Sequence, residues 1–303
     1  MRRIFVLMGV MAIATTGFAK EKGETASAFL KLGAGARAAG MGDAYVAVAD
    51  DATAGYWNPA GLAQVEGKQG TFMFLRPMAE VEDLAMSYIG IAIPASCGNF
   101  GGAITYYGYG ETDETTGVDS NGDPIKGKTW DAYDFACSLS FAKDVKKDTS
   151  LGATLKIVNG KIAESTAIAF ACDFGLLQKK NRLSIGAVIK NIGSSMKYEQ
   201  EGFGLPLSVK AGVSYKLLRL PLLLSADLTL PNDNKTHFNF GTEYSIKEVF
   251  SLRCGYKSGP EDEGSGLTFG AGTKYLDLYS FDYAYQTFDK LGDSHRISLS
   301  AKF

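Results

Sequence analysis

The last eight residues, Arg296-Ile297-Ser298-Leu299-Ser300-Ala301-Lys302-Phe303, alternate polar and apolar side chains one by one. Successive side chains of an extended strand point to opposite faces. This stretch would therefore place its apolar residues on one face and its polar residues on the other. The pattern indicates a β-strand that lies between two different environments.

The same alternation recurs along the chain from about residue 69 onward. Segments of about ten residues have the length that a tilted strand needs to cross a bilayer. Applied to the whole chain, the pattern predicts about fourteen strands, over residues 69–78, 84–94, 98–108, 129–141, 149–159, 164–175, 181–191, 205–216, 221–230, 235–245, 249–258, 265–274, 276–287 and 293–303.

The composition agrees with this fold class and argues against others. Glycine accounts for 36 of the 303 residues and proline for only 8, which is typical of a β protein with many tight turns. A net charge of −2 gives no basic field that would favour nucleic acid as a partner. Hydrophobic residues make up 46% of the chain, which argues against disorder.

A soluble β-sandwich would also show alternating strands. Two features favour a membrane barrel instead. The polar faces carry long charged side chains next to Gly and Ser, as a wet lumen would, and the apolar faces carry aromatic residues near the strand ends. We therefore predict an all-β fold, a transmembrane antiparallel β-barrel of about fourteen strands. With a wet interior, Ser298→Arg should cost much less stability than Leu299→Arg.

The lengths of the connections provide an independent argument. In a barrel with an even number of strands, the odd-numbered connections share the outer end. The long connections at 109–128, 192–204 and 259–264 all fall on that end, and short turns such as 95–97, 176–180, 217–220 and 246–248 fall on the other. Long external loops and short periplasmic turns are the rule in such barrels.

The N-terminal part of the chain differs from the rest. Arg2 and Arg3, an apolar run over 4–14 and small residues ending at Ala19 predict a signal peptide over residues 1–19. Residues 20–68 are rich in Ala and Gly and lack the strand alternation, whereas residues 69–303 are expected to form the barrel.

Two stretches of the mature chain resemble a known family. The segment from Phe29 to Leu62, which contains Gly40-Met-Gly-Asp-Ala-Tyr45 and Tyr56-Trp-Asn-Pro-Ala-Gly-Leu62, resembles the N-terminal segment of the PorV/PorQ family. Residues 281–285 and 291–300 look like the ending of that family. The family lies within the group of FadL-type (long-chain fatty acid transporter-like) barrels of the bacterial outer membrane, so the resemblance implies fourteen strands and this location.

The resemblance also implies roles for particular residues. In FadL-type transporters the N-terminal segment is a hatch that plugs the barrel and carries an Asn-Pro-Ala motif, which corresponds here to Asn58, Pro59 and Ala60 within a hatch over residues 20–68. Phe303 would be the terminal aromatic residue that the barrel assembly machinery recognises.

Local chemistry is consistent with a compact hatch. Asp50 or Asp51 is expected to cap a short helix over 52–57, Pro59 to interrupt it, and Gly61 to permit a tight exit. We expect Asn58, Pro59, Ala60 and Gly61 to control opening of the barrel. The alternative is a packed plug with no gating role.

Several cationic residues fall on the polar faces of the predicted strands. They could be neutralised by lumenal carboxylates, or their excess could attract a carboxylate head group. The lumen-facing candidates are Lys156, Arg182, Lys190, Lys210, Arg253, Lys257 and Arg296.

Other chemical signals are weak. Asp119, Asn121 and Asp123 in the long 109–128 connection could hold Ca²⁺, although a solvated turn is favoured because the full ligand pattern is missing. The sequence predicts no cofactor, no other metal site and no enzymatic activity. Cys137, Cys172 and Cys254 all fall on apolar faces of strands that are not neighbours, so we expect no disulfide among them.

The expected function is a diffusive outer-membrane channel for hydrophobic molecules, gated by the N-terminal hatch. The alternative is a PorV-like component of type 9 secretion that binds secreted cargo at the outer membrane, and a purely structural barrel also stays open. The expected partners are outer-membrane lipid, the barrel assembly machinery, and either hydrophobic small molecules or secreted proteins.

Overall fold

The computed structural model describes residues 24–81, 83–259, 266–287 and 292–303. The predicted signal peptide over residues 1–19 lies outside the described residues, as does most of the predicted connection 259–264.

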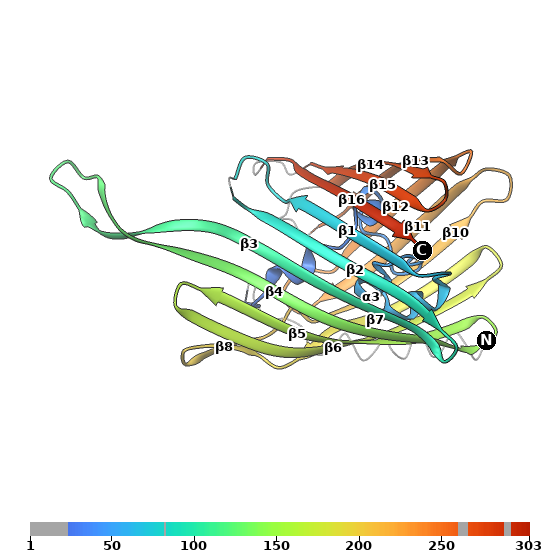
Figure 1. Cartoon of the computed structure of the whole chain (residues 1–303), viewed down its shortest axis with the longest axis horizontal. Coiled ribbons are helices and arrows are strands. Elements are labelled where there is room, and N and C mark those ends of the chain that lie inside the picture. Colours follow the sequence, from blue (N-terminus) through green and yellow to red (C-terminus); the bar gives the residue numbers. More distant parts are fainter. Residues whose placement is uncertain (1–23, 82, 260–265, 288–291) are drawn as a thin grey trace.

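The wall is a closed barrel of fourteen antiparallel strands, which confirms the predicted fold and strand number (Figure 1). Each strand pairs with its neighbour in sequence, and β1 closes the ring against β16, with Phe72 opposite Leu299. The strands are β1 (Gln69–Arg76), β2 (Ala85–Ala95), β3 (Gly98–Val118), β4 (Pro124–Lys146), β5 (Thr149–Ile162), β6 (Ser165–Lys180), β7 (Leu183–Gly193), β10 (Ser208–Lys216), β11 (Leu222–Pro231), β12 (His237–Ile246), β13 (Phe250–Lys257), β14 (Gly266–Tyr275), β15 (Tyr279–Gln286) and β16 (Ser294–Lys302).

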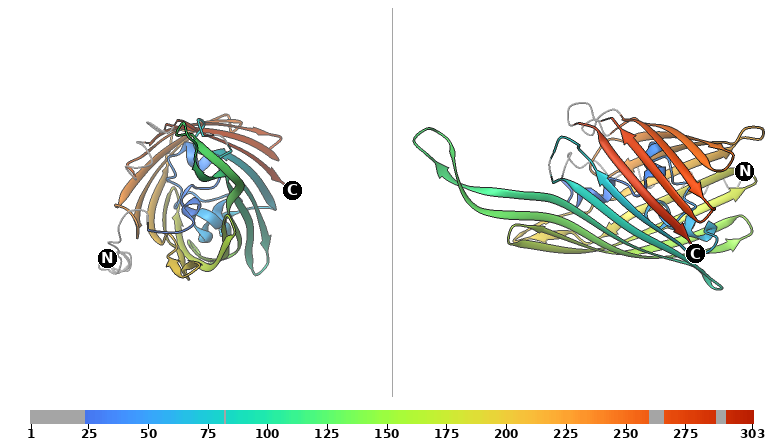
Figure 2. Two further views of the ribbon diagram at one scale, coloured as in Figure 1. Left: turned by 90° about the vertical axis from the view of Figure 1, so that its left-hand side faces the viewer. Right: turned by 45° about the horizontal axis from the view of Figure 1, so that its top comes forward.

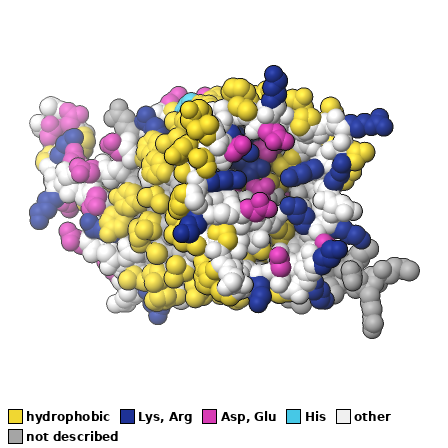
Figure 3. Space-filling view, turned by 45° about the vertical axis from the view of Figure 1, so that its right-hand side comes forward, with side chains coloured by type: hydrophobic (Ala, Val, Ile, Leu, Met, Phe, Trp, Pro, Cys, Tyr) yellow, Lys and Arg dark blue, Asp and Glu magenta, His cyan; other side chains and the backbone are white. Residues whose placement is uncertain are grey.

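The two faces of the wall differ as the alternation predicts. In β16, Ile297 and Leu299 point outward and are 40% and 52% exposed, whereas Ser298 between them points inward and is buried. Figure 3 shows a band of hydrophobic side chains across the outer wall, with charged side chains gathered toward the two ends. Such a band is the surface that a bilayer covers.

The strands on one end are longer than the alternation predicts. The predicted connection 109–128 is mostly strand, because β3 continues to Val118 and β4 begins at Pro124 (Figure 1). The alternation of apolar and polar residues ends where β3 and β4 extend beyond the hydrophobic band of the outer wall, but their backbones continue to pair as a two-stranded ribbon. At the opposite end residues 176–180 belong to β6 rather than to a turn. The connection 192–204 contains a separate small hairpin of β8 (Met196–Tyr198) and β9 (Glu201–Phe203).

The remaining short elements precede the wall. They are η1 (Ala28–Lys31), α2 (Ala36–Gly40), α3 (Ala54–Trp57) and η2 (Pro59–Gln64). Among the described residues, no helix combines the length and the apolar character needed to cross a bilayer. Figure 2, which looks along the barrel from the end with the β3–β4 hairpin, shows these elements inside the ring of strands.

Candidate functional site

The N-terminal segment, residues 24–68, lies inside the barrel and contacts most of its circumference. Helix α2 packs against β13 to β16, and η2 packs against β3 to β6 on the other side. Its largest side chain, Trp57, is 1% exposed and donates through Nε1 to the carbonyl oxygen of Ala34 at 2.7 Å. Aromatic packing of Trp57 on Tyr45 and Tyr56 and this hydrogen bond fold the segment back on itself inside the barrel.

The turn before Asn58 differs from the expected capped helix. Helix α3 spans Ala54–Trp57, shorter than the predicted 52–57, and its N-cap residue is Thr53, whose side chain makes no capping hydrogen bond. The expectation that Asp50 or Asp51 caps the helix is therefore wrong. Asp51 Oδ1 accepts the backbone N–H of Thr53 at 2.8 Å ahead of the helix, and Asp50 accepts a hydrogen bond from Arg37.

Asn58 joins the segment to the wall. Its Nδ2 donates to the carbonyl oxygens of Val46, at 2.9 Å, and of Leu176 in β6, at 3.1 Å. Its Oδ1 accepts the N–H of Ala60 at 3.2 Å, which starts η2 with Pro59 in its first turn. The side chain is fully buried, so every one of these bonds is made away from solvent.

Gly61 has a different local role from the one expected. It lies within η2 rather than at an exit, and a side chain there would overlap the carbonyl oxygen of Ala49. The residue is therefore required for close approach of two backbone segments of the N-terminal segment. Pro59 and Ala60 are also buried.

Several inward-facing glycines of the wall lie directly against the N-terminal segment. Gly152 and Gly175 lie opposite each other in β5 and β6, and a Cβ on either would overlap atoms of residues 58–60. Only a residue without a side chain lets the backbone of the segment come this close. The same close approach to residues 41–46 recurs at Gly186, Gly212, Gly241 and Gly255.

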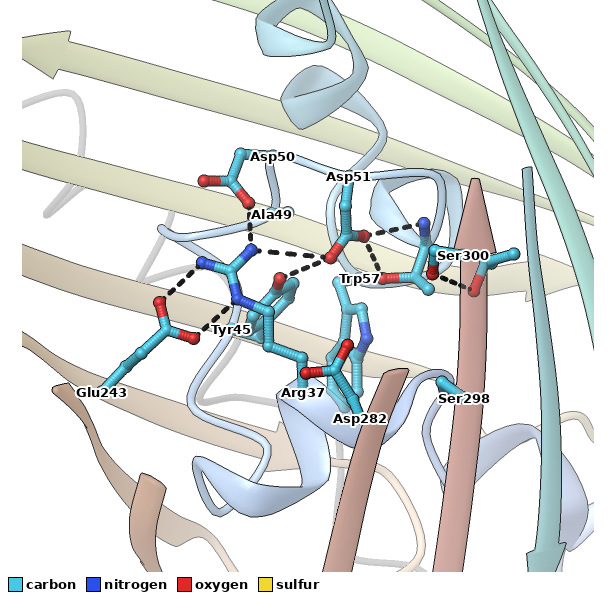
Figure 4. Close-up of polar contacts among 12 residues, drawn as sticks. Arg37, Tyr45, Ala49, Asp50, Asp51, Trp57, Glu243, Asp282, Ser298 and Ser300 are labelled. Carbon is cyan, nitrogen blue, oxygen red and sulfur yellow. Dashed lines mark hydrogen bonds and ion pairs between the residues drawn. The ribbon is translucent and has the colours of Figure 1, made fainter. Parts of the chain in front are cut away.

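Arg37 is the centre of a polar network between the segment and the wall (Figure 4). Its Nε and Nη2 donate to the two carboxylate oxygens of Glu243 in β12, at 2.8 and 2.9 Å, and Nη1 donates to Asp50 at 2.6 Å. Burial alone would lower the pKa of the guanidinium, but the carboxylates of Asp50 and Glu243 raise it well above its ordinary value. Arg37 therefore acts as a permanent cationic link.

A cavity of about 410 Å³ opens beside this network, at the end of the barrel that carries the short turns. Its lining is polar and includes Arg37 and Asp51 of the N-terminal segment and Ser300 and Lys302 of β16.

Six of the seven candidate lumenal cations point into the barrel. Four of them make ion pairs or hydrogen bonds there. Lys156 pairs with Asp173, Lys257 pairs with Asp43, and Arg296 donates to the carbonyl oxygen of Leu32. Arg253 pairs with both Glu243 and Asp282.

Two further lysines lie near aromatic rings. Lys190 Nζ is 3.7 Å from the centre of the Tyr56 ring, and Lys210 Nζ is 5.6 Å from that of Trp57. Arg182, in contrast, lies in the turn between β6 and β7, because β7 begins only at Leu183.

An apolar cluster inside the barrel was not expected from the sequence. Phe29 and Leu30 of η1 are buried against inward-facing side chains of the wall. The strands predicted over 69–78, 84–94 and 98–108 alternate less cleanly than the later strands, because apolar residues occur on both of their faces. This mixed pattern is the sequence signal that could have identified the apolar cluster. The cluster includes Met73, Leu75, Met86, Tyr88, Tyr107 and Val158 of the wall, and Met196 and Leu205 of the connection between β7 and β10.

The structure adds a constraint at Ser298. Its Oγ accepts the N–H of Ala36 at 2.8 Å, and the residue also lines the polar cavity at the turn end. An arginine there would lose this hydrogen bond but would border the cavity, so the lower cost of Ser298→Arg than of Leu299→Arg stays a prediction.

The tip of the β3–β4 hairpin is a turn stabilised by Asp119. Its Oδ1 accepts the backbone N–H groups of Asn121 and Asp123, at 2.8 and 2.9 Å, and these bonds lower the pKa of the carboxyl group. Within the described ranges no group of three or more acidic, His or Cys side chains is placed to hold a metal ion.

Phe303 follows β16 at the turn end. Its N–H donates to the carbonyl oxygen of Lys68 at 2.9 Å, and its ring is 74% exposed on the outer wall.

Comparison with known proteins adds the family. The family model of the type IX secretion system protein PorV matches residues 19–219, which is more than half of the chain. The chain belongs to the PorV family. A comparison with curated proteins finds no match.

Solved structures with the same fold include FadL-type barrels. The toluene transporter TbuX of Ralstonia pickettii aligns with a TM-score of 0.69 and 15% identity, over 89% of this chain and 98% of that one. The toluene transporter TodX of Pseudomonas putida gives 0.66 and 14%, over 88% and 96%. A Pseudomonas aeruginosa FadL homologue gives 0.55 and 12%, over 88% and 97%. This PorV-family chain is an outer-membrane β-barrel with the fold of these transporters.

Proposed function

We propose that the chain is a diffusive channel for hydrophobic molecules in which the N-terminal segment acts as a hatch. The observation that carries the proposal is the apolar cluster inside the barrel, where Phe29 and Leu30 fill an apolar lining of the wall. A site that accepts these two side chains has the chemistry to accept a hydrophobic molecule in their place. That toluene transporters share the fold supports the same substrate class.

The way the segment is attached makes movement feasible. Among the described residues, one isolated bridge between Thr25 and Gly204 is the sole strand-like pairing of the segment with the barrel. Most other polar attachments use side chains, such as those of Asn58, Arg37 and Ser298. Each such hydrogen bond contributes on the order of 0.5–1.5 kcal/mol, or more where a charge takes part. The hatch can therefore leave its seat without disrupting the ladder of the wall.

A reversible cross-link tests the hatch directly. Ala36 and Ser298 are in hydrogen-bond contact across the interface, so Ala36→Cys with Ser298→Cys is placed to form a disulfide. The four native cysteines are replaced by alanine to give a clean background. In liposomes, entry of a fluorescent hydrophobic probe should be blocked in the oxidised protein and restored by a reductant.

The two single-cysteine variants are the matched controls, because neither can form the cross-link. Their probe entry should not respond to oxidant or reductant. Equal entry through the oxidised and reduced double variant, with the disulfide verified by mass spectrometry, would rule out a moving hatch at this contact.

A second candidate function is the docking of secreted proteins, as the name of the family model implies. The β3–β4 hairpin favours it, since an isolated two-stranded ribbon is marginally stable in water and gains from a partner. Val118 and Ile125 are 66% and 47% exposed near its tip. The hairpin also carries several acidic residues, among them Glu111, Asp113, Glu114, Asp119 and Asp123.

This candidate is tested by shortening the hairpin. Replacing residues 112–130 by Asn-Gly keeps the barrel strands and forms a tight hairpin turn. If docking is the function, export of secreted proteins by the producing bacterium should fall while probe entry into liposomes stays unchanged. Unaltered export would dismiss the hairpin as a docking element.

A further inference from the structure

Lys190 is a buried cation without an anionic partner. It is 3% exposed, and among the described residues its ammonium group makes no hydrogen bond or ion pair. Its contact at 3.7 Å is with the face of the Tyr56 ring. The positive charges of Lys156 and of Lys210 each act on it more strongly than the carboxylate of Asp173 or of Asp43 does.

Lys190 faces inward by the regular alternation of β7, and a bulge in the wall turns its neighbour Asn191 to the same side. The register between β6 and β7 shifts after Cys172, and Asn191 adopts a positive φ of 62°. Lys190 and Asn191 are consequently both buried on the inner side, although neighbours in a strand normally point to opposite faces. Asp173 Oδ1 accepts the N–H of Asn191 at 2.7 Å and Lys156 donates to Asn191 Oδ1 at 2.7 Å, which holds the bulge rigid.

Lys190 lines a small cavity of about 60 Å³ inside the barrel, which we call the cationic pocket. Its lining has more cations than carboxylates: Lys31, Lys190, Lys210 and Lys257 face Asp43 and Asp233. The two aspartates are already engaged, because Lys31 pairs with Asp233 at 3.1 Å and Lys257 pairs with Asp43. Neither carboxylate is therefore left to neutralise Lys190.

We propose that the cationic pocket binds a small carboxylate at Lys190, on the side that faces Lys210. A buried ammonium group is costly unless an anion or hydrogen-bond acceptor accompanies it. The volume suits a group of a few atoms, and the presence of Asp43 and Asp233 favours a singly charged anion over a phosphate dianion. The ring of Tyr56 and the apolar side chains of Leu30, Pro206 and Pro231 also line the pocket and would contact the carbon atoms of the ligand. The site does not depend on movement of the hatch.

Trp57 provides a reporter, since Lys190 Nζ lies 5.8 Å and Lys210 Nζ 5.6 Å from its ring. The chain contains one other tryptophan, Trp130, so Trp130→Phe makes the fluorescence specific. Acetate is titrated into this protein in a neutral detergent at constant ionic strength, with chloride as the replaced anion. The fluorescence should change in a saturable way, and acetamide, which has nearly the same shape but no charge, should give no response.

Two lysine variants locate the site. Lys190→Met keeps most of the side-chain volume and should weaken acetate binding by about tenfold or more, the value of a charge-assisted hydrogen bond. Lys147→Met removes an exposed lysine in the turn between β4 and β5 and should leave binding unchanged. If Lys190→Met does not yield a heat-modifiable folded barrel, Lys210→Met takes its place with the same expectation.

The remaining outcomes either assign the ligand or refute the site. Tighter binding of butyrate than of acetate would assign the carboxylate to a larger molecule with an apolar tail, whereas equal binding would assign a free small acid. A flat acetate titration, an equal response to acetamide, or unchanged affinity in Lys190→Met would overturn the proposal. Phosphate binding more tightly than acetate would overturn the choice of carboxylate.

Discussion

The side-chain amide of Asn58 donates to the main-chain carbonyl of Leu176 at 3.1 Å, and this bond ties the N-terminal segment to strand β6 of the barrel. A backbone carbonyl inside a strand normally serves the ladder or solvent. Here the carbonyl oxygen also accepts a hydrogen bond from the N-terminal segment, next to the inward-facing glycines of the wall.

Asn58→Ala should loosen the hatch without removing the barrel. The change leaves the carbonyl oxygens of Val46 and Leu176 without this donor, at a cost of about 1–3 kcal/mol for a stranded buried group. We expect a normal amount of protein in the outer membrane and faster entry of a hydrophobic probe. Asn121→Ala in the exposed hairpin turn is the control, and identical entry in both variants would favour the secretion role instead.

Gly175→Ala should disturb the same contact from the side of the wall. The added methyl group would overlap Asn58 Oδ1, so either the wall or the segment must shift, at a cost of about 1–3 kcal/mol for overpacking. In Gly102→Ala the methyl group meets Ile91 at ordinary contact distance, 3.5 Å. Urea unfolding in liposomes should therefore separate the two alanine variants; equal midpoints would contradict the close seating of the hatch.

Leu299→Arg should destabilise the barrel because it places a charge on the face toward the lipid. The cost is about 2–4 kcal/mol if the residue lies near the midplane of the bilayer. Ser300→Arg is the matched variant, since Ser300 lines the polar cavity at the turn end and leaves room for a charged side chain. Similar losses for both, measured by unfolding in liposomes, would refute the assignment of the two faces.

Deletion of Phe303 should affect assembly more than stability. Its ring is exposed on the outer wall, and contact with lipid is worth only about 1.5–3 kcal/mol. We expect less protein in the outer membrane, while the fraction that has inserted unfolds at nearly the same urea concentration as the full chain. A normal amount in the membrane would show that assembly does not depend on this residue.

Much of the wall could be predicted from the sequence. The alternation in 296–303 depends on neighbours in the chain and on the two solvents that a strand meets, so it identifies the faces, the strand number and the membrane setting without knowledge of any distant contact. The full length of the β3–β4 hairpin could not be predicted in this way. The two strands continue to pair beyond the lipid-facing region, where apolar and polar side chains no longer alternate in the sequence.

The interior could be predicted only in part. The Asn-Pro-Ala motif marked the place where the segment meets the wall, but the partners of Asn58 and Arg37, at Leu176 and Glu243, lie more than a hundred residues away in the chain. Alternation predicted that Lys190 faces the lumen, but the buried position of Asn191 beside it depends on a bulge that adds one residue to β7, which no local pattern predicts.

The sequence by itself thus determined the wall, because each strand chooses its faces by local alternation between lipid and lumen. Only the tertiary structure decided what the lumen contains. The seating of the N-terminal segment on Gly152 and Gly175, the apolar cluster around Phe29 and the contact of Lys190 with the Tyr56 ring all arise from contacts between distant segments. Such contacts exist only once closure of the barrel has brought these segments within van der Waals and hydrogen-bond range of one another.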